Sequence, residues 1–290
     1  MGIKSQIRKL FRPATSDRAR QDWARAESNR ADRSPMERDG SVHETLETAA
    51  TLAAKFPDIP ASYREIYLAV RSLTMTSPER IFGLCQAVDH VVQQDLPGDF
   101  VECGVWRGGS SVAMIRCLLN GNMRQRRFWL YDTFEGMSSP TDHDVDCFGN
   151  PADKLLERDS EDRVAPTSVW CEASLADVQQ NIASCGYPSD QVHFVQGKVE
   201  DTIPAQVPDR IALLRLDTDW FESTWHELVH LYPRLVPGGI LIIDDYGHWQ
   251  GCRQAVDQYL AQHAPDLFLH RLDYTGRLAI KPYSSQGRTP

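Results

Sequence analysis

The sequence lacks any apolar run of about 18 residues and any apolar segment of the kind that directs secretion. A chain without such segments does not insert stably in a bilayer, so we expect a cytoplasmic protein. Its 290 residues are 41% hydrophobic and 24% charged. That size and composition suit one large globular domain with an extension.

The chain also lacks an excess of positive charge and lacks closely paired cysteines. Its formal net charge is −9, whereas a nucleic-acid binder usually carries a basic face, so we expect no nucleic-acid partner. The seven cysteines include no Cys-x-x-Cys pair, which argues against a disulfide framework and a structural zinc site. We expect most of them to be small core residues.

Composition divides the chain into three regions. Residues 1–40 are rich in charge and poor in large apolar groups, which predicts a flexible or loosely packed basic extension. Residues 41–98 show a helical period, and we expect helices that pack beside a sheet and roof the site. Residues 99–290 form the main domain. Within it, 138–165 is acidic and has no clear period, which predicts a lid or a disordered insert.

The main domain alternates short apolar runs with helical stretches, which predicts an α/β, doubly wound, Rossmann-like sheet that is mostly parallel. The expected parallel strands are 100–105, 127–132, 191–196, 211–217 and 239–244. Two further strands, 267–272 and 278–281, predict a C-terminal antiparallel hairpin because a glycine-containing link joins them. The carboxyl ends of such strands form the crevice where ligands bind.

A glycine-rich turn, Gly104-x-x-x-Gly108-Gly109-Ser110, follows the first expected strand. It lets the backbone approach a ligand closely, but it is not the Gly-x-Gly-x-x-Gly pattern that cradles a pyrophosphate. Glu102 before the turn suits the ammonium of an amino-acid moiety. Asp132, at the end of the second strand, suits the two hydroxyls of a ribose. Both features also have structural explanations, as a packing turn and as a turn cap.

Three aspartates, Asp217, Asp244 and Asp245, close two neighbouring strands. Carboxylate oxygens are the ligands that Mg²⁺ prefers, and three of them side by side would repel one another without a cation. A structural alternative is that individual members cap the helices that follow. Asp219 completes an Asp-x-Asp pair with Asp217, which many metal-dependent glycosyltransferases also contain. His226-Glu-x-x-His230 matches a zinc-protease pattern, but the apolar stripe of its helix favours a coincidence.

At these motifs the chain resembles the macrocin O-methyltransferase family of Mg²⁺- and S-adenosylmethionine (SAM)-dependent sugar O-methyltransferases. The shared stretches are Phe100-Val-Glu-Cys-Gly-Val-Trp-Arg-Gly-Gly-Ser-Ser111, Tyr131-Asp-Thr-Phe-Glu-Gly-Met137, Leu214-Arg-Leu-Asp-Thr-Asp-Trp220 with Glu222-Ser-Thr224, Leu231-Tyr-Pro-Arg-Leu-Val-Pro-Gly-Gly239, and Ile243-Asp-Asp-Tyr246 with Cys252-Arg-Gln-Ala-Val256. Residues 1–40 and the acidic insert match no part of that pattern.

The resemblance implies that Asp217, Asp244 and Asp245 hold Mg²⁺ and that Asp219 is the general base. It also implies a SAM site that includes the 74–77 segment. The expected cofactor residues are Thr76, Glu102, Gly104, Val105, Gly108, Ser110, Ser111, Asp132, Thr133, Phe134, Met137, Val199, Glu200 and Asp217.

The function expected on these grounds is methyl transfer from SAM to a hydroxyl of a sugar or glycosylated natural product, by a homo-oligomer (a dimer or tetramer). An alcohol is a weak nucleophile at neutral pH, so such a site must supply a base and stabilise the developing alkoxide. The alternatives are a metal-dependent glycosyltransferase and a non-catalytic SAM-binding protein. His248, just past the aspartate pair, is a candidate contact for the acceptor or a plain loop histidine.

Overall fold

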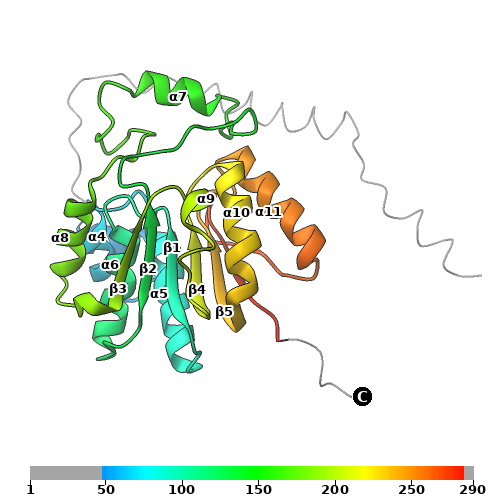
Figure 1. Ribbon diagram of the computed structural model, residues 1–290. Coiled ribbons are helices and arrows are strands. Elements are labelled where there is room, and N and C mark those ends of the chain that lie inside the picture. The colour runs from blue at the N-terminus through cyan, green and yellow to red at the C-terminus, as the bar shows by residue number, and fades with distance from the viewer. Residues whose placement is uncertain (1–47, 284–290) are drawn as a thin grey trace, which may run out of the picture. The chain divides into compact units, whose positions relative to one another are not determined.

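The computed structural model describes residues 48–283, which belong to one compact unit of the chain. Its centre is a seven-stranded sheet of order β3-β2-β1-β4-β5-β7-β6 (Figure 1). The strands are β1 (Asp99–Cys103), β2 (Phe128–Asp132), β3 (Val192–Gln196), β4 (Ile211–Leu216), β5 (Leu235–Ile243), β6 (His270–Arg271) and β7 (Arg277–Ile280). The first five pair in parallel, whereas β7 pairs antiparallel with both β5 and β6.

This topology confirms the predicted doubly wound sheet and its C-terminal hairpin. Two strands begin more than two residues away from the prediction, whereas the other boundaries agree within two residues. β5 begins at Leu235 and not at Gly239, because the strand continues through Pro237 and Gly238 with a shift of register against β4. β6 is two residues long, since only His270 and Arg271 pair with β7.

Helices cover both faces of the sheet, in the order expected from the alternating pattern. They are α3 (Ala49–Lys55), α4 (Ala61–Val70), α5 (Pro78–Gln93), α6 (Gly109–Asn120), α7 (Ala152–Arg158), α8 (Leu175–Ala183), α9 (Val199–Thr202), α10 (Phe221–Leu231) and α11 (Gln250–His263), with short 3₁₀ turns η1 (Ser189–Gln191) and η2 (Tyr232–Arg234).

Alternating side chains of each strand enter two separate cores. Phe100 and Leu213 pack with α4, α5, α6 and α8, whereas Val101 and Leu214 pack with α9, α10 and α11. This alternation follows from the period of two in a strand.

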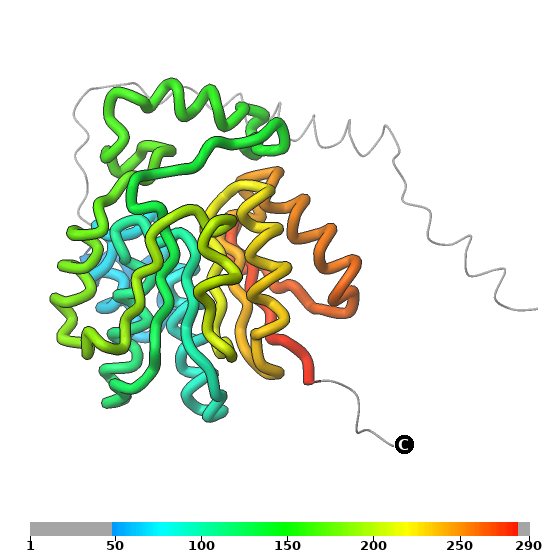
Figure 2. Tube along the Cα trace, in the orientation of Figure 1, coloured from blue at the N-terminus to red at the C-terminus, as the bar shows by residue number. Residues whose placement is uncertain are grey.

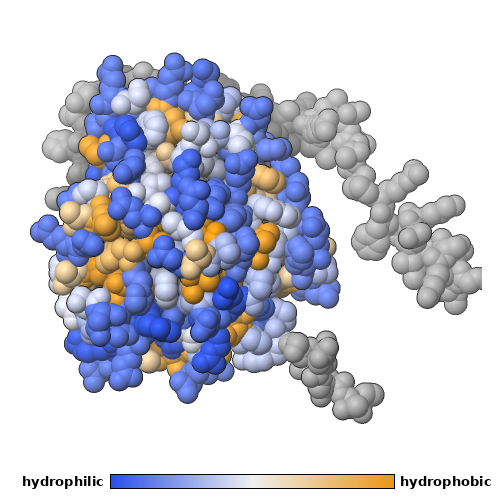
Figure 3. Space-filling model, viewed as in Figure 1, coloured by the Kyte–Doolittle hydropathy of each residue, from blue (hydrophilic) through white to orange (hydrophobic). Residues whose placement is uncertain are grey.

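The described part of the N-terminal region, from residue 48, is helical as predicted, and α5 packs against α6 and the sheet. The expected extension at 1–40 lies outside the described residues. The acidic insert contains α7, a helix that the unclear period did not predict. Figure 2 shows this segment crossing above the carboxyl ends of the strands. In Figure 3, hydrophilic residues dominate around α7, and apolar residues gather mainly in a band below it.

Candidate active site

A cavity of about 330 Å³ lies at the carboxyl ends of the parallel strands. It is the crevice that an open α/β sheet offers to ligands. Most of the predicted site residues line it, namely Thr76, Gly104, Val105, Ser110, Asp132, Thr133, Met137, Val199, Glu200, Asp217, Asp219, Asp244 and Asp245. Glu102, Gly108, Ser111 and Phe134 lie outside this lining, next to residues that belong to it.

The glycine-rich turn brings three chain segments into close contact. Gly104 has φ +79°, and a Cβ atom there would overlap the carbonyl oxygen of Asp217. The backbone N–H of Gly109 donates to the carbonyl of Leu73 at 3.0 Å. A Cβ atom at Gly109 would crowd the same carbonyl group and Thr74. The 73–76 segment therefore reaches the cavity because glycines leave it room, as expected for that segment.

Asp132 holds the two turns that border this end of the cavity. Its Oδ2 accepts hydrogen bonds from the N–H groups of Val105 (2.7 Å) and Trp106 (3.0 Å), and its Oδ1 accepts one from Phe134 (2.7 Å). Burial raises the pKa of Asp132, and the backbone donors act against that rise. A carboxylate oxygen can accept more than one hydrogen bond, so these bonds do not prevent Asp132 from binding a ligand as well. Asp132 is thus a turn cap that also faces the cavity.

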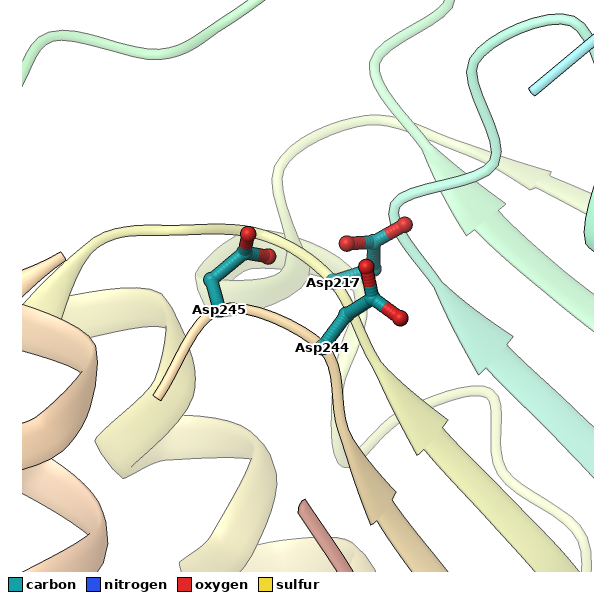
Figure 4. Close-up of side chains that lie close together, drawn as sticks. All are labelled: Asp217, Asp244 and Asp245. Atoms are coloured by element: carbon teal, nitrogen blue, oxygen red, sulfur yellow. The ribbon is translucent and has the colours of Figure 1, made fainter. Parts of the chain in front are cut away.

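The three candidate metal ligands converge as predicted. Asp217, Asp244 and Asp245 each offer an oxygen, and the three oxygens lie within 4.8 Å of one another. Figure 4 shows their carboxylates gathered beyond the ends of β4 and β5. Burial raises the pKa of Asp217 and Asp245 well above the usual range, and the neighbouring carboxylates add to the rise. Oδ2 of Asp245 is buried without a hydrogen-bond partner, which suits an oxygen that ligates a cation.

Arg215, which the motifs did not single out, lies at the base of this cluster. Its side chain is 2% exposed. Nη1 lies 2.7 Å from Oε1 of Glu102 and 2.6 Å from Oδ2 of Asp217, and Nη2 lies 2.8 Å from Oδ1 of Asp244. Burial alone lowers the pKa of Arg215, but these carboxylates raise it well above its ordinary value, so the guanidinium is charged. The sequence signal that could have identified it is a single Arg inside the apolar run Leu-Leu-Arg-Leu.

Glu102 consequently lies beneath the cavity and not on its wall. Its second oxygen accepts a hydrogen bond from the hydroxyl of Ser111, and its side chain is 1% exposed. Burial raises the pKa of Glu102, while Arg215 and Ser111 oppose that rise. Within the described structure, therefore, the charged partner of Glu102 is the guanidinium of Arg215.

Arg80 is a second cation that the sequence motifs did not indicate. It begins from α5, pairs with Asp244, and places Nε 3.1 Å from Oδ2 of Asp273 in the hairpin link. Ser77, the N-cap of α5, donates to the same Asp273 oxygen at 2.9 Å. Arg80 thereby connects the helical N-terminal region, the aspartate cluster and the C-terminal hairpin.

Asp219 lies against the aspartate cluster. Its backbone has an unusual conformation. Its φ is +68°, a region that residues other than glycine rarely adopt. Burial raises the pKa of Asp219 to about 7, and its carboxylate interacts with Asp245 and Trp249. A carboxylate with that pKa can accept a proton near neutral pH. A strained residue at a cavity wall is typical of a functional position.

The zinc-protease pattern at His226–His230 does not form a metal site. His226 Nε2 lies 2.9 Å from the carbonyl of Ile203, and Glu227 is fully buried, accepting a hydrogen bond from Thr218 at 2.8 Å. Among residues 48–283, the one group of three candidate ligands is the aspartate cluster. The match is therefore a coincidence, as the apolar stripe of its helix indicated.

A family model described as macrocin-O-methyltransferase (TylF) matches residues 38–279. The chain belongs to this family. It is an S-adenosylmethionine-dependent O-methyltransferase, as the resemblance implied, and the glycosyltransferase alternative is not supported. Within the described part of the chain, no helix has both the length and the apolar character needed to cross a membrane.

Two relatives and one solved structure illustrate the likeness. The chain is 38% identical to mycinamicin III 3''-O-methyltransferase of Micromonospora griseorubida over 66% of its own length and 71% of the relative. It is 36% identical to 8-demethyl-8-(2,3-dimethoxy-alpha-L-rhamnosyl)-tetracenomycin-C 4'-O-methyltransferase of Streptomyces olivaceus. That match covers 70% of this chain and 73% of the relative. The structure of the O-methyltransferase NovP aligns with a TM-score of 0.64 at 28% identity, over 83% of this chain and 99% of that one.

Proposed function

We propose that the protein transfers a methyl group from SAM to a hydroxyl of a sugar on a glycosylated natural product, with Mg²⁺ as the metal and in a homo-oligomeric assembly. The observation that carries this proposal is the single cavity that joins the glycine-rich turn to the aspartate cluster. The relatives named above act on the sugars of such compounds, which supports the same acceptor class here.

The cofactor part of the proposal rests on the wall between the glycine-rich turn and α9. Gly104, the 73–76 segment and Asp132 all line this part of the cavity. We assign the ribose to Asp132, and the remaining predicted residues of the turn to the walls of the pocket. Glu102 acts through Arg215, whose charge it fixes. The bound SAM supplies an electrophilic methyl group.

The metal part rests on the aspartate cluster. Asp217, Asp244 and Asp245 would hold Mg²⁺, which supplies Lewis acidity that lowers the pKa of a nearby hydroxyl. Arg215 and Arg80 keep two of these ligands in place from below and from the side. The hard oxygen donors suit magnesium and not zinc, which prefers nitrogen and sulfur.

Asp219 is the base in this proposal. It lies beside Asp245 but belongs to the loop after β4, so its carboxylate faces the cavity without being one of the three ligands. It accepts the proton of the acceptor hydroxyl as the oxygen attacks the methyl carbon. Trp249, which interacts with it, fixes the orientation of the carboxylate.

The substitution Asp219→Asn tests this assignment. The amide keeps the size of the side chain but cannot take a proton, so kcat should fall by about 10²–10⁴ with little change in SAM affinity. Labelled-methyl transfer gives kcat, and calorimetry gives the SAM dissociation constant. A fall of less than about threefold would assign the base to another residue. Failure of the wild-type protein to bind SAM at all would contradict the cofactor assignment itself.

A further inference from the structure

An aromatic cluster lies at the cavity, next to the aspartate cluster. We call Phe148, His248, Trp249 and Tyr274 the aromatic rim. The centroid of the His248 ring lies 6.4 Å from that of Phe148, 5.0 Å from that of Trp249 and 6.1 Å from that of Tyr274, and each pair is close to perpendicular. His248, Trp249 and Tyr274 line the cavity, and Phe148 lies against them.

Two of the rim rings face solvent to an unusual extent. Phe148 is 79% exposed and Tyr274 is 55% exposed, although both contact the same imidazole. Single exposed apolar residues are common, but exposed aromatic rings grouped at the edge of a cavity mark a binding surface.

The rim is held in place before any ligand arrives. Oδ1 of Asp146 accepts hydrogen bonds from the N–H groups of Phe148 and Asn150, both at 2.8 Å. On the other side, Oδ1 of Asp273 accepts from the N–H of Thr275 at 2.9 Å. Backbone loops fixed in this way lose little entropy when a ligand binds. The two acidic side chains are thus structural and leave the rim surface apolar.

The rim also adjoins the catalytic cluster directly. The N–H groups of His248 and Trp249 both donate to the carbonyl of Asp245, at 3.0 Å. Asp219, the proposed base, lines the same cavity as His248, Trp249 and Tyr274. A sugar hydroxyl at Asp219 therefore leaves the rest of the acceptor on the rim side.

We propose that the aromatic rim is an acceptor subsite that binds an uncharged, apolar aglycone attached to the methylated sugar. This inference rests on the proposed function, because it takes the sugar to lie at the aspartate cluster. Flat apolar groups stack well on exposed rings and bury their surface there. A nucleoside diphosphate would instead bring its charges onto a surface that offers no unpaired cation among the described rim residues.

The test compares two glycosides of one sugar, 1-naphthyl and methyl α-L-rhamnoside, which differ only in the group that would reach the rim. Binding is measured by calorimetry on full-length protein saturated with S-adenosylhomocysteine and Mg²⁺. The wild-type protein should bind the naphthyl glycoside at least about tenfold more tightly than the methyl glycoside. Phe148→Ala combined with Tyr274→Ala should reduce that ratio to less than about threefold.

Phe268→Ala is the matched control, because Phe268 is also 79% exposed but its ring lies against His270 and not against a residue of the rim. It should leave the ratio unchanged. Equal affinities in the wild-type protein, no saturable binding of the naphthyl glycoside at about millimolar concentration, or a ratio that survives the double substitution would overturn the proposal. A double variant that changes the oligomeric state but not the ratio would make the rim an interface between copies. Normal SAM binding in any of these cases leaves the proposed function standing.

Discussion

Nη2 of Arg215 lies 2.8 Å from Oδ1 of Asp244, so a buried guanidinium supports a candidate metal ligand from beneath. Arg215 and Glu102 are register partners on the neighbouring strands β4 and β1. Asp217 follows β4 and Asp244 follows β5, and both lie on the same face of the sheet as Arg215. One positive charge in the core of the sheet thereby gathers carboxylates from three strands at one point.

Arg215→Met should lower the free energy of unfolding by about 3–5 kcal/mol, because it leaves Glu102 buried without its cationic partner. Urea unfolding measures this change. The double variant Arg215→Met with Glu102→Gln should lose less than the sum of the two single variants, since the pair is removed together. Additive losses would contradict a coupled pair.

Asp245→Asn should weaken Mg²⁺ binding by at least about tenfold, because one of three carboxylate ligands loses its charge. SAM affinity should stay the same, since the cofactor wall uses other residues. Calorimetry with each ligand measures both quantities. Asp153→Asn, an exposed carboxylate on α7, is the control and should change neither. Unchanged Mg²⁺ affinity in Asp245→Asn would remove Asp245 from the ligand set.

Gly104→Ala should destabilise the protein more than Gly186→Ala. Both glycines have positive φ, which costs an alanine about 1–2 kcal/mol. At Gly186 no atom lies within 4 Å of the added Cβ, whereas at Gly104 the Cβ overlaps the backbone of Asp217. The extra loss should reach at least about 2 kcal/mol in urea unfolding. Equal losses would mean that the turn and the loop after β4 move apart freely.

The acidic insert should be cut by trypsin faster in the free protein than with SAM and an accepted substrate bound. The expected sites are Lys154 and Arg158, whose side chains are exposed on α7, a helix of seven residues that is too short to be stable alone. Cleavage should be slower when the segment closes over both ligands. Peptide mapping at intervals measures the rates, and identical rates in the two states would count against a lid.

The acidity of this insert has a structural component that composition alone did not show. Oδ1 of Asp144 accepts a hydrogen bond from the N–H of Phe221 at 2.8 Å, and its Oδ2 accepts one from the N–H of Thr141 at 2.7 Å. The carboxylate of Asp144 thus anchors the insert to the N-terminus of α10, and the carboxylate of Asp146 accepts hydrogen bonds from Phe148 and Asn150 within the insert. Two of the acidic side chains of the insert are therefore committed to the fold.

The strands were predictable because each apolar run ends in a turn signal or a charge, and period-two burial leaves few alternatives. The start of β5 was not, since Pro237 and Gly238 are read as a turn although the strand bulges through them. Helix α7 was missed because seven residues span only two turns, too few to establish a period.

The aspartate cluster could be predicted because parallel strands bring their carboxyl ends together whatever the exact register. Arg80 and Arg215 could not be placed in the same way. Their roles depend on which side chains face each other across strands and from α5, and a single arginine in a sequence carries no record of its partners. The sequence placed Glu102 next to the glycine-rich turn. It did not predict that Arg215 would pair with Glu102 and separate it from the cavity.

The pairing of Asp244 with Arg80 and Arg215 has a consequence for how the enzyme is made. Two guanidinium groups already pair with this carboxylate, so folding does not need the proposed Mg²⁺ to offset the charge of Asp244. In the proposed mechanism the ion binds reversibly to a site that is already folded, and it is not a structural element. A chelator would then abolish the activity and leave the fold intact, and adding Mg²⁺ back would restore the activity.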